Sequence, residues 1–118
     1  MNSYKELVVW QKSIDLVEEI YNLTNDFPKV EIYGITNQMR RASVSIPSNI
    51  SEGFARKHRQ EYLQFLRIAF GSGAELETQL IISKRLGFIK NTKKADELLS
   101  EVMRMLNRLI ASVCNPSG

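Results

Sequence analysis

Apolar residues recur along most of the chain at intervals of three and four, which is the period of an amphipathic α-helix. This pattern predicts helices at about residues 4–27, 33–56, 60–86 and 92–113, separated by short segments. Helices joined by short connections pack as antiparallel neighbours. We therefore expect an all-α fold, an up-down-up-down four-helix bundle, in which residues 1–118 form a single domain.

The first predicted helix carries two apolar stripes, more than one partner helix requires. Ser3 and Glu6 have the spacing of a capping box at its start, and Pro28 is expected to end it. The main stripe consists of Leu7, Trp10, Ile14, Val17, Tyr21 and Thr24, and the parallel stripe consists of Val9, Leu16, Ile20, Leu23 and Phe27.

The second predicted helix contains Pro47 near its middle. Proline lacks a backbone donor and crowds the carbonyl of Ser43, at a cost of about 3 kcal/mol. The apolar stripe nevertheless continues through it, over Ile35, Met39, Ala42, Ile46, Ile50 and Gly53. Two helices broken at Ile46–Pro47 are an alternative, but the unbroken stripe favours one proline-kinked helix.

The third helix is expected to pack against the second around a turn near residue 57. Its core stripe is Tyr62, Leu66, Ala69, Gly73, Leu76, Leu80 and Ser83. An antiparallel register about that turn places Ala42 and Ser43 opposite residues 71–74, so that small residues meet small residues. The same register predicts interhelical ion pairs of Arg40 and Arg41 with Glu75 and Glu77.

The fourth helix is expected to follow a glycine that ends the third helix and a residue that can cap the fourth. Gly87 is placed to end the third helix, and Thr92 to cap the fourth. The apolar stripe of the fourth helix is Ala95, Leu98, Val102, Leu106, Leu109 and Val113, backed by Leu99, Met105 and Ile110.

The central hairpin also carries a family resemblance. The run YGITNQMRRASVSIPSNISEGFAR, followed by EYLQFLRIAFGSGAELETQL, resembles the four-helix-bundle family encoded in intervening sequences of bacterial 23S ribosomal RNA genes. The likeness extends from Leu7 and Trp10 to Gly87. That family also includes the accessory variability determinant of diversity-generating retroelements. The resemblance implies a pentameric assembly and, from the retroelement members, binding of nucleic acid and of a reverse transcriptase.

Signals of catalysis are weak in this sequence. His58 is the single histidine and Cys114 the single cysteine, too few for a bundle di-iron site or a zinc site. No Gly-x-Ser-x-Gly motif appears, and Gly71-Ser72-Gly73 lacks the spacing and the lysine of a phosphate loop. We expect no enzyme activity, no metal and no cofactor.

Composition and charge limit the kinds of partner that the protein is expected to bind. Hydrophobic residues make up 43% and charged residues 25%, which is typical of a globular domain. The net charge of +3 is uneven, because residues 1–36 carry three bases against six acids and residues 37–70 carry six bases against two acids. The hairpin bases form a candidate surface for RNA or DNA, comprising Arg56, Lys57, Arg59 and Arg67. A solvated basic surface is the alternative.

The expected location is the cytoplasm, without membrane contact. No apolar run approaches the ~20 residues of a membrane span, the N-terminus lacks the pattern of a signal peptide, and a lone cysteine permits no intrachain disulfide.

A second apolar face of the third helix predicts self-association. Phe65, Ile68 and Ile82 lie away from the core stripe, so a monomer would expose them, unless they occupy buried corners of the bundle. We therefore predict a homo-oligomer, with five subunits implied by the resemblance. The predicted function is non-catalytic binding of structured RNA or of a ribonucleoprotein partner such as a nucleic-acid-processing protein. The alternative is a structural or protein-interaction oligomer that binds no nucleic acid.

Overall fold

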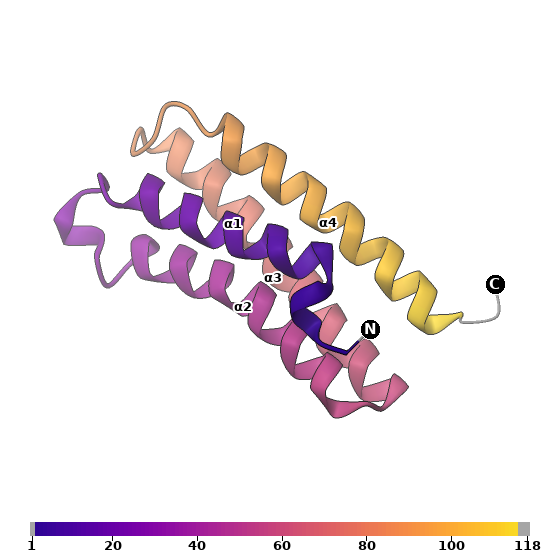
Figure 1. Ribbon diagram of the computed structural model, residues 1–118. Coiled ribbons are helices and arrows are strands. Elements are labelled where there is room, and N and C mark those ends of the chain that lie inside the picture. The colour runs from indigo at the N-terminus through magenta and orange to yellow at the C-terminus, as the bar shows by residue number, and fades with distance from the viewer. Residues whose placement is uncertain (1, 116–118) are drawn as a thin grey trace.

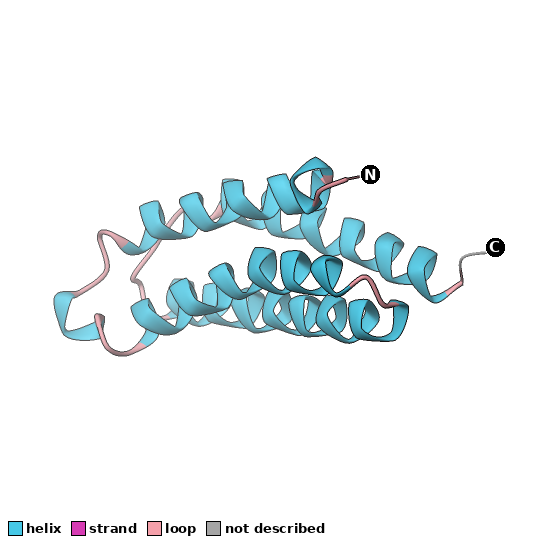
Figure 2. Ribbon diagram, turned by 60° about the horizontal axis from the view of Figure 1, so that its bottom comes forward, coloured by secondary structure: helices cyan, strands magenta, loops and turns pink. Residues whose placement is uncertain are grey.

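The computed structural model describes residues 2–115, and within them every regular element is a helix (Figures 1 and 2). The α-helices are α1 (Val8–Thr24), α2 (Ile35–Arg56), α3 (Arg59–Arg85) and α4 (Lys93–Cys114), with short 3-10 turns η1 (Tyr4–Glu6) and η2 (Lys29–Glu31). Each α-helix packs against the next, and α4 returns to α1 to close the bundle. The predicted all-α up-down bundle is confirmed, as an elongated body of 48 × 23 × 20 Å.

The start of the first helix differs from the prediction. The capping box of Ser3 and Glu6 is present, but it caps η1, and Leu7 then adopts an extended conformation (ψ 122°) before α1 begins. The core-facing stripe also differs. Val9, Leu16 and Ile20 are buried, so the stripe predicted as the parallel one faces the core. Most of the stripe predicted as the main one is half-buried or exposed, at Leu7, Trp10, Ile14, Val17 and Tyr21. Leu7 and Trp10 pack against the edge of the core.

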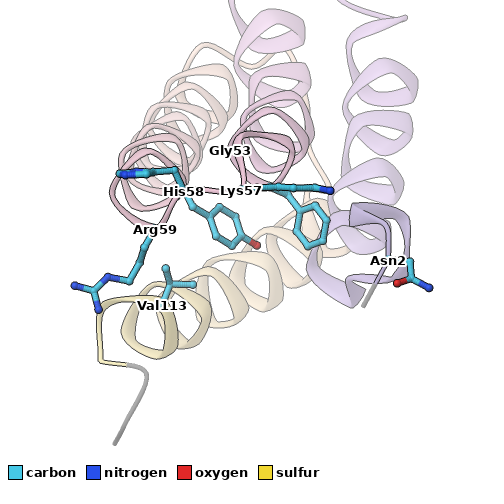
Figure 3. A pocket seen from close by; sticks show the side chains of 8 residues that line it. Asn2, Gly53, Lys57, His58, Arg59 and Val113 are labelled. Atoms are coloured by element: carbon cyan, nitrogen blue, oxygen red, sulfur yellow. The ribbon is translucent and has the colours of Figure 1, made fainter.

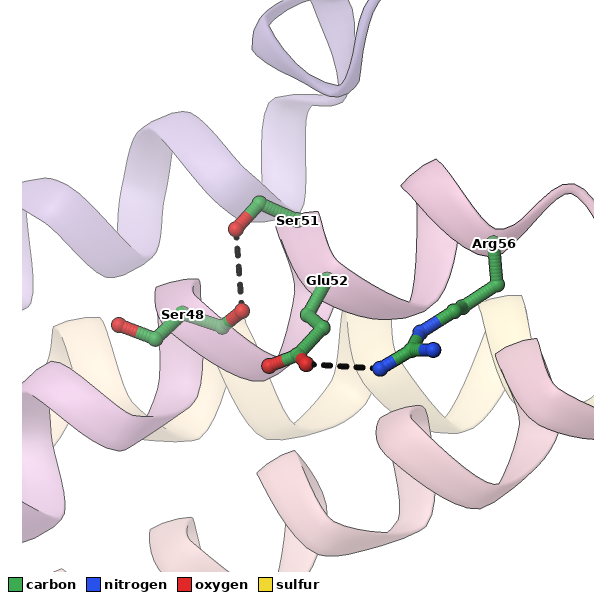
Figure 4. Close-up of polar contacts among 4 residues, drawn as sticks. All are labelled: Ser48, Ser51, Glu52 and Arg56. Atoms are coloured by element: carbon green, nitrogen blue, oxygen red, sulfur yellow. Dashed lines mark hydrogen bonds and ion pairs between the residues drawn. The ribbon is translucent and has the colours of Figure 1, made fainter.

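Helix α2 continues through Pro47, so the alternative of two broken helices is wrong. Pro47 is buried between Ile46 and Ile50, which are fully buried in the core. Side chains near the proline hydrogen-bond to backbone carbonyls. Asn49 Nδ2 donates to Ser45 O at 2.8 Å, and Ser51 Oγ donates to Ser48 O at 3.0 Å (Figure 4). The bend of the helix at Pro47 stays a prediction.

The antiparallel pairing of α2 and α3 is confirmed by two side-chain contacts. The hydroxyl oxygens of Ser45 and Ser72 lie 2.8 Å apart, and Ser83 Oγ donates to Met39 Sδ at 3.3 Å. The midpoint of the Ser45–Ser72 pair falls between residues 58 and 59, at the turn, whereas the midpoint of the Met39–Ser83 pair falls at residue 61, a few residues beyond it.

The expected meeting of small residues is wrong for two glycines. Gly71 faces open space, and Gly73 packs against Met103 of α4 rather than against α2. The glycine enclosed between α2 and α3 is Gly53, where an added Cβ would lie 2.7 Å from Phe65 Cβ. A glycine therefore permits close approach of the two helices near the turn, at Gly53 of α2, and not at the predicted glycines of α3.

The two ends of the α3–α4 connection match their predicted positions. Gly87 follows α3 with φ 78°, a left-handed conformation that favours glycine. Thr92 precedes α4, but its Oγ1 donates to Asp96 Oδ2 at 2.7 Å instead of capping a backbone N–H.

Candidate functional site

The turn between α2 and α3 brings three basic residues to one end of the bundle. Lys57 ends α2 in the left-handed region (φ 56°), His58 is extended (φ −137°), and α3 begins at Arg59. All three side chains are exposed. The chain therefore reverses direction within two residues, and three consecutive basic side chains face the solvent.

An open hollow of about 530 Å³ lies beside this turn (Figure 3). Lys57 and Arg59 extend away from each other around it, and Val113 of α4 contributes to its wall. Its full lining is Asn2, Gly53, Phe54, Lys57, His58, Arg59, Tyr62 and Val113, a set without a carboxylate. The hollow therefore combines an apolar floor with a cationic rim.

The floor contains two aromatic rings in contact. The rings of Phe54 and Tyr62 meet edge to face, with centroids 6.0 Å apart. Burial raises the pKa of the Tyr62 phenol above its usual value, so the hydroxyl stays protonated at neutral pH. Aromatic residues flanking a basic turn were visible in the sequence, but helical spacing assigned Tyr62 to the core and left Phe54 unassigned.

Arg56 and Arg67 do not join this hollow. Arg56 forms an ion pair with Glu52 at 3.0 Å (Figure 4), and its guanidinium lies over the Phe65 ring, 5.2 Å from the centroid. Arg67 lies further along α3, in a separate hollow with Glu61 and Ile68. Of the four predicted nucleic-acid contacts, the structure brings together Lys57 and Arg59, and it adds His58.

The predicted ion pairs between α2 and α3 are not formed. The ion pairs within residues 2–115 join Lys12 to Glu101, Arg56 to Glu52 and Lys94 to Glu19. Arg40 turns toward α1 instead, and Arg41 forms no ion pair within the described residues.

The predicted oligomer face is only partly exposed. Ile68 and Ile82 are 46% and 41% exposed, whereas Phe65 is half-buried against Gly53 and beneath Arg56. Phe65 therefore stabilises the α2–α3 contact within one subunit. Ile68 and Ile82 are the members of this set that a partner could cover.

Metal-ligating side chains and apolar helices are two further features of residues 2–115 that bear on function. No group of three or more histidine, cysteine, aspartate or glutamate side chains is placed there to hold a metal ion. None of the helices in this part of the chain is both long and apolar enough to cross a membrane. The absence of a cofactor and of catalysis stays a prediction.

Comparisons with known proteins give a family and a fold. The chain matches a crystal structure of a protein of unknown function from the S23 ribosomal protein family of Bacteroides thetaiotaomicron. The two are 24% identical, the match covers 88% of this chain and 96% of the other, and the TM-score is 0.80, so this likeness supports the fold alone. No curated protein matches.

A model of the 23S rRNA-intervening sequence protein family matches residues 5–108, most of the chain. Neither comparison concerns the accessory proteins of retroelements, so that relation stays a prediction. Because the family model spans both the hairpin and most of the two outer helices, this chain belongs to the 23S rRNA-intervening sequence protein family.

Proposed function

We propose that this protein is a non-catalytic binding protein whose α2–α3 end binds structured RNA. The observation that carries the proposal is the exposed run of Lys57, His58 and Arg59 around an open hollow without a lining carboxylate. Within the described residues, neither Lys57 nor Arg59 forms an ion pair. Their charges are therefore available to an anionic partner.

Phosphate groups suit this surface for an electrostatic reason. Each lysine or arginine that contacts a nucleic-acid phosphate releases condensed counterions, which favours binding and makes it depend on salt. The surface offers charges without a set of side chains arranged to read base edges. Structured RNA is recognised largely by shape and backbone contacts, because its major groove is too deep and narrow for side chains.

We also propose that the protein forms a homo-oligomer, which would raise RNA affinity. A single copy offers few phosphate contacts, whereas copies held together raise the effective concentration of each contact. The exposed side chains of Ile68 and Ile82 support self-association, and five subunits is the number that the family resemblance implies. A nucleic-acid-processing protein bound to the same RNA is the partner that the resemblance suggests.

The test compares two variants that remove the same charge from opposite ends of α3. Lys57→Gln/Arg59→Gln removes the proposed contacts, and Lys84→Gln/Arg85→Gln removes two exposed bases from the last turn of the helix. At low salt, the first variant should bind an RNA hairpin about ten-fold more weakly or worse, and the control should change little.

Arg56→Gln should have a smaller effect, because Glu52 already compensates that charge. Equal binding by the wild type and Lys57→Gln/Arg59→Gln would contradict the proposal and favour a protein-interaction oligomer.

A further inference from the structure

Arg40 is held in one orientation by two contacts with α1. Its Nε donates to Thr24 Oγ1 at 2.9 Å, and its guanidinium lies over the Tyr21 ring, 4.6 Å from the centroid. Thr24 is itself buried and donates to Ile20 O at 2.7 Å, so the acceptor is fixed as well. The rotational freedom of Arg40 is therefore restricted before any ligand arrives, which lowers the entropic cost of binding one.

The free end of this guanidinium has no partner within the described residues. Nε makes the hydrogen bond to Thr24, while the two terminal nitrogens donate to no described side chain. The nearby carboxylates predicted to pair with Arg40 and Arg41 do not do so. An arginine that its neighbours immobilise, but that has no carboxylate within ion-pair distance, can offer its free N–H groups to an external anion.

A hollow of about 490 Å³ lies along the outer seam between α1 and α2, beside Arg40. It is lined by Tyr21, Asn37, Arg40, Arg41, Val44 and Ser45, again without a carboxylate. Arg41 is exposed and Asn37 can donate from its side-chain amide. The Ser45 hydroxyl is already engaged with Ser72 and Asn49, so the available donors are Asn37, Arg40, Arg41 and the Tyr21 hydroxyl.

We propose that this hollow is a binding site for a phosphate group. A guanidinium presents parallel N–H donors that match two phosphate oxygens, and a second guanidinium with an amide can contact the remaining oxygens. The hollow exceeds the size of one phosphate, so it leaves room for a further group such as that of a nucleotide or an RNA backbone. Arg41 lies 16 residues before Lys57 on α2, roughly 24 Å along the helix, so the site is distinct from the α2–α3 end.

The direct test is a titration of the full chain with inorganic phosphate at low salt, followed by NMR of the arginine Nε–H resonances. The hydrogen bond to Thr24 protects the Arg40 Nε–H from exchange with water, which favours its observation. We expect a saturable shift of this resonance with phosphate, and none with chloride at equal ionic strength. Absence of a saturable shift in the wild-type protein would overturn the proposal.

Three variants distinguish a specific phosphate site from non-specific attraction of phosphate to a basic protein. Arg41→Gln should weaken phosphate binding about ten-fold, the usual effect of losing one charge-assisted hydrogen bond. Arg108→Gln removes the same charge from an exposed position on α4 and should leave the affinity unchanged. Thr24→Val keeps every charge but frees Arg40, and it should also weaken binding.

Equal phosphate affinity in Arg41→Gln and Arg108→Gln would overturn the proposal. Loss of oligomeric mass in Arg41→Gln without any effect of phosphate would also overturn it, and would assign these arginines to a contact between copies. Lys57→Gln/Arg59→Gln should leave phosphate binding intact, so this proposal can fail or hold independently of the RNA proposal.

A competition experiment distinguishes the source of the phosphate. If the group belongs to an RNA backbone, a short RNA oligonucleotide will displace inorganic phosphate, and Arg41→Gln will weaken RNA binding. If it belongs to a small phosphate compound, adenosine monophosphate will displace inorganic phosphate and the oligonucleotide will not. Either displacement supports the site, while displacement by neither probe would contradict it.

Discussion

Gly53 leaves no room for a side chain between α2 and α3. A Cβ at this position would lie 2.7 Å from Phe65 Cβ and 3.3 Å from the backbone oxygen of Tyr62, and neither atom can move without shifting α3. We predict that Gly53→Ala lowers the free energy of unfolding by about 1–3 kcal/mol, the usual cost of overpacking. Urea denaturation monitored by circular dichroism measures it.

Gly71→Ala is the matched control for this prediction. Gly71 also lies within a helix, but an added Cβ would have no neighbour within 4 Å. The higher helix propensity of alanine should therefore stabilise the protein by about 0.5–1 kcal/mol. Equal effects of the two substitutions would show that packing at Gly53 is not the constraint.

Individual contacts are the part of this structure that the sequence predicts least well. Arg40 and Arg41 are adjacent in the chain, and successive helical residues point about 100° apart. The sequence register placed both near α3, whereas Arg40 contacts Thr24 and Tyr21 of α1. Phe65 is less exposed than predicted for a similar reason, because spacing could not reveal the cover provided by Arg56.

At the scale of elements, the N-terminal capping box gives a pH dependence. Backbone N–H groups of Asn2 and Ser3 donate to the Glu6 carboxylate at 2.8 and 3.1 Å, and they lower its pKa below the ordinary 4.5. A lowered folded-state pKa means that the charged form stabilises the fold above the ordinary value. This contribution is lost as the pH falls through the folded-state pKa.

We therefore predict that Glu6→Gln is less stable than the wild type at pH 7 and that the difference shrinks in acid. The carboxyl carbon resonance of Glu6 should titrate with a midpoint below that of an exposed glutamate without backbone partners. A midpoint at or above the ordinary value would contradict the capping role.

The helices themselves were predictable, since each carries a sustained apolar period. The apolar periodicity of the sequence also continues across Pro47, where α2 is continuous. It could not reveal the break at Leu7, because the apolar stripe begins at that residue and the period gives no signal before it. Nor could it decide which of two parallel stripes of α1 faces the core, since that depends on where α2 and α4 pack.

At the scale of the whole molecule, the exposed face of α3 predicts an oligomer. Ile68 and Ile82 are exposed on a face rotated from the core, and Ile81 is 51% exposed on another side of the same helix. We predict that Ile68→Glu dissociates the assembly to a 13.5 kDa subunit, because a charge would have to be buried at the interface. Ile81→Glu should leave it intact. Multi-angle light scattering measures both masses, and a monomeric wild-type protein at micromolar concentration would refute the assembly.

Across the molecule, the excess of basic over acidic residues was evident from composition. The division of these basic residues into separate surface sites was not. The three-dimensional arrangement separates Lys57 and Arg59 at one end from Arg40 and Arg41 at the α1–α2 seam, and it compensates Arg56 with Glu52. Linear clustering had grouped Arg56 with the free bases and had assigned Arg40 and Arg41 to ion pairs. Which charges are available depends on side-chain partners, and these are set by the fold.

The measurement that tests the RNA proposal most directly is the salt dependence of RNA affinity. Each phosphate contact contributes about one unit to the slope of the logarithm of the binding constant against the logarithm of salt concentration. Lys57→Gln/Arg59→Gln should therefore reduce the magnitude of this slope by about two units or more, while Lys84→Gln/Arg85→Gln should leave it unchanged. A slope that is the same in the wild type and in Lys57→Gln/Arg59→Gln would contradict the assignment of the α2–α3 end as the RNA-binding surface.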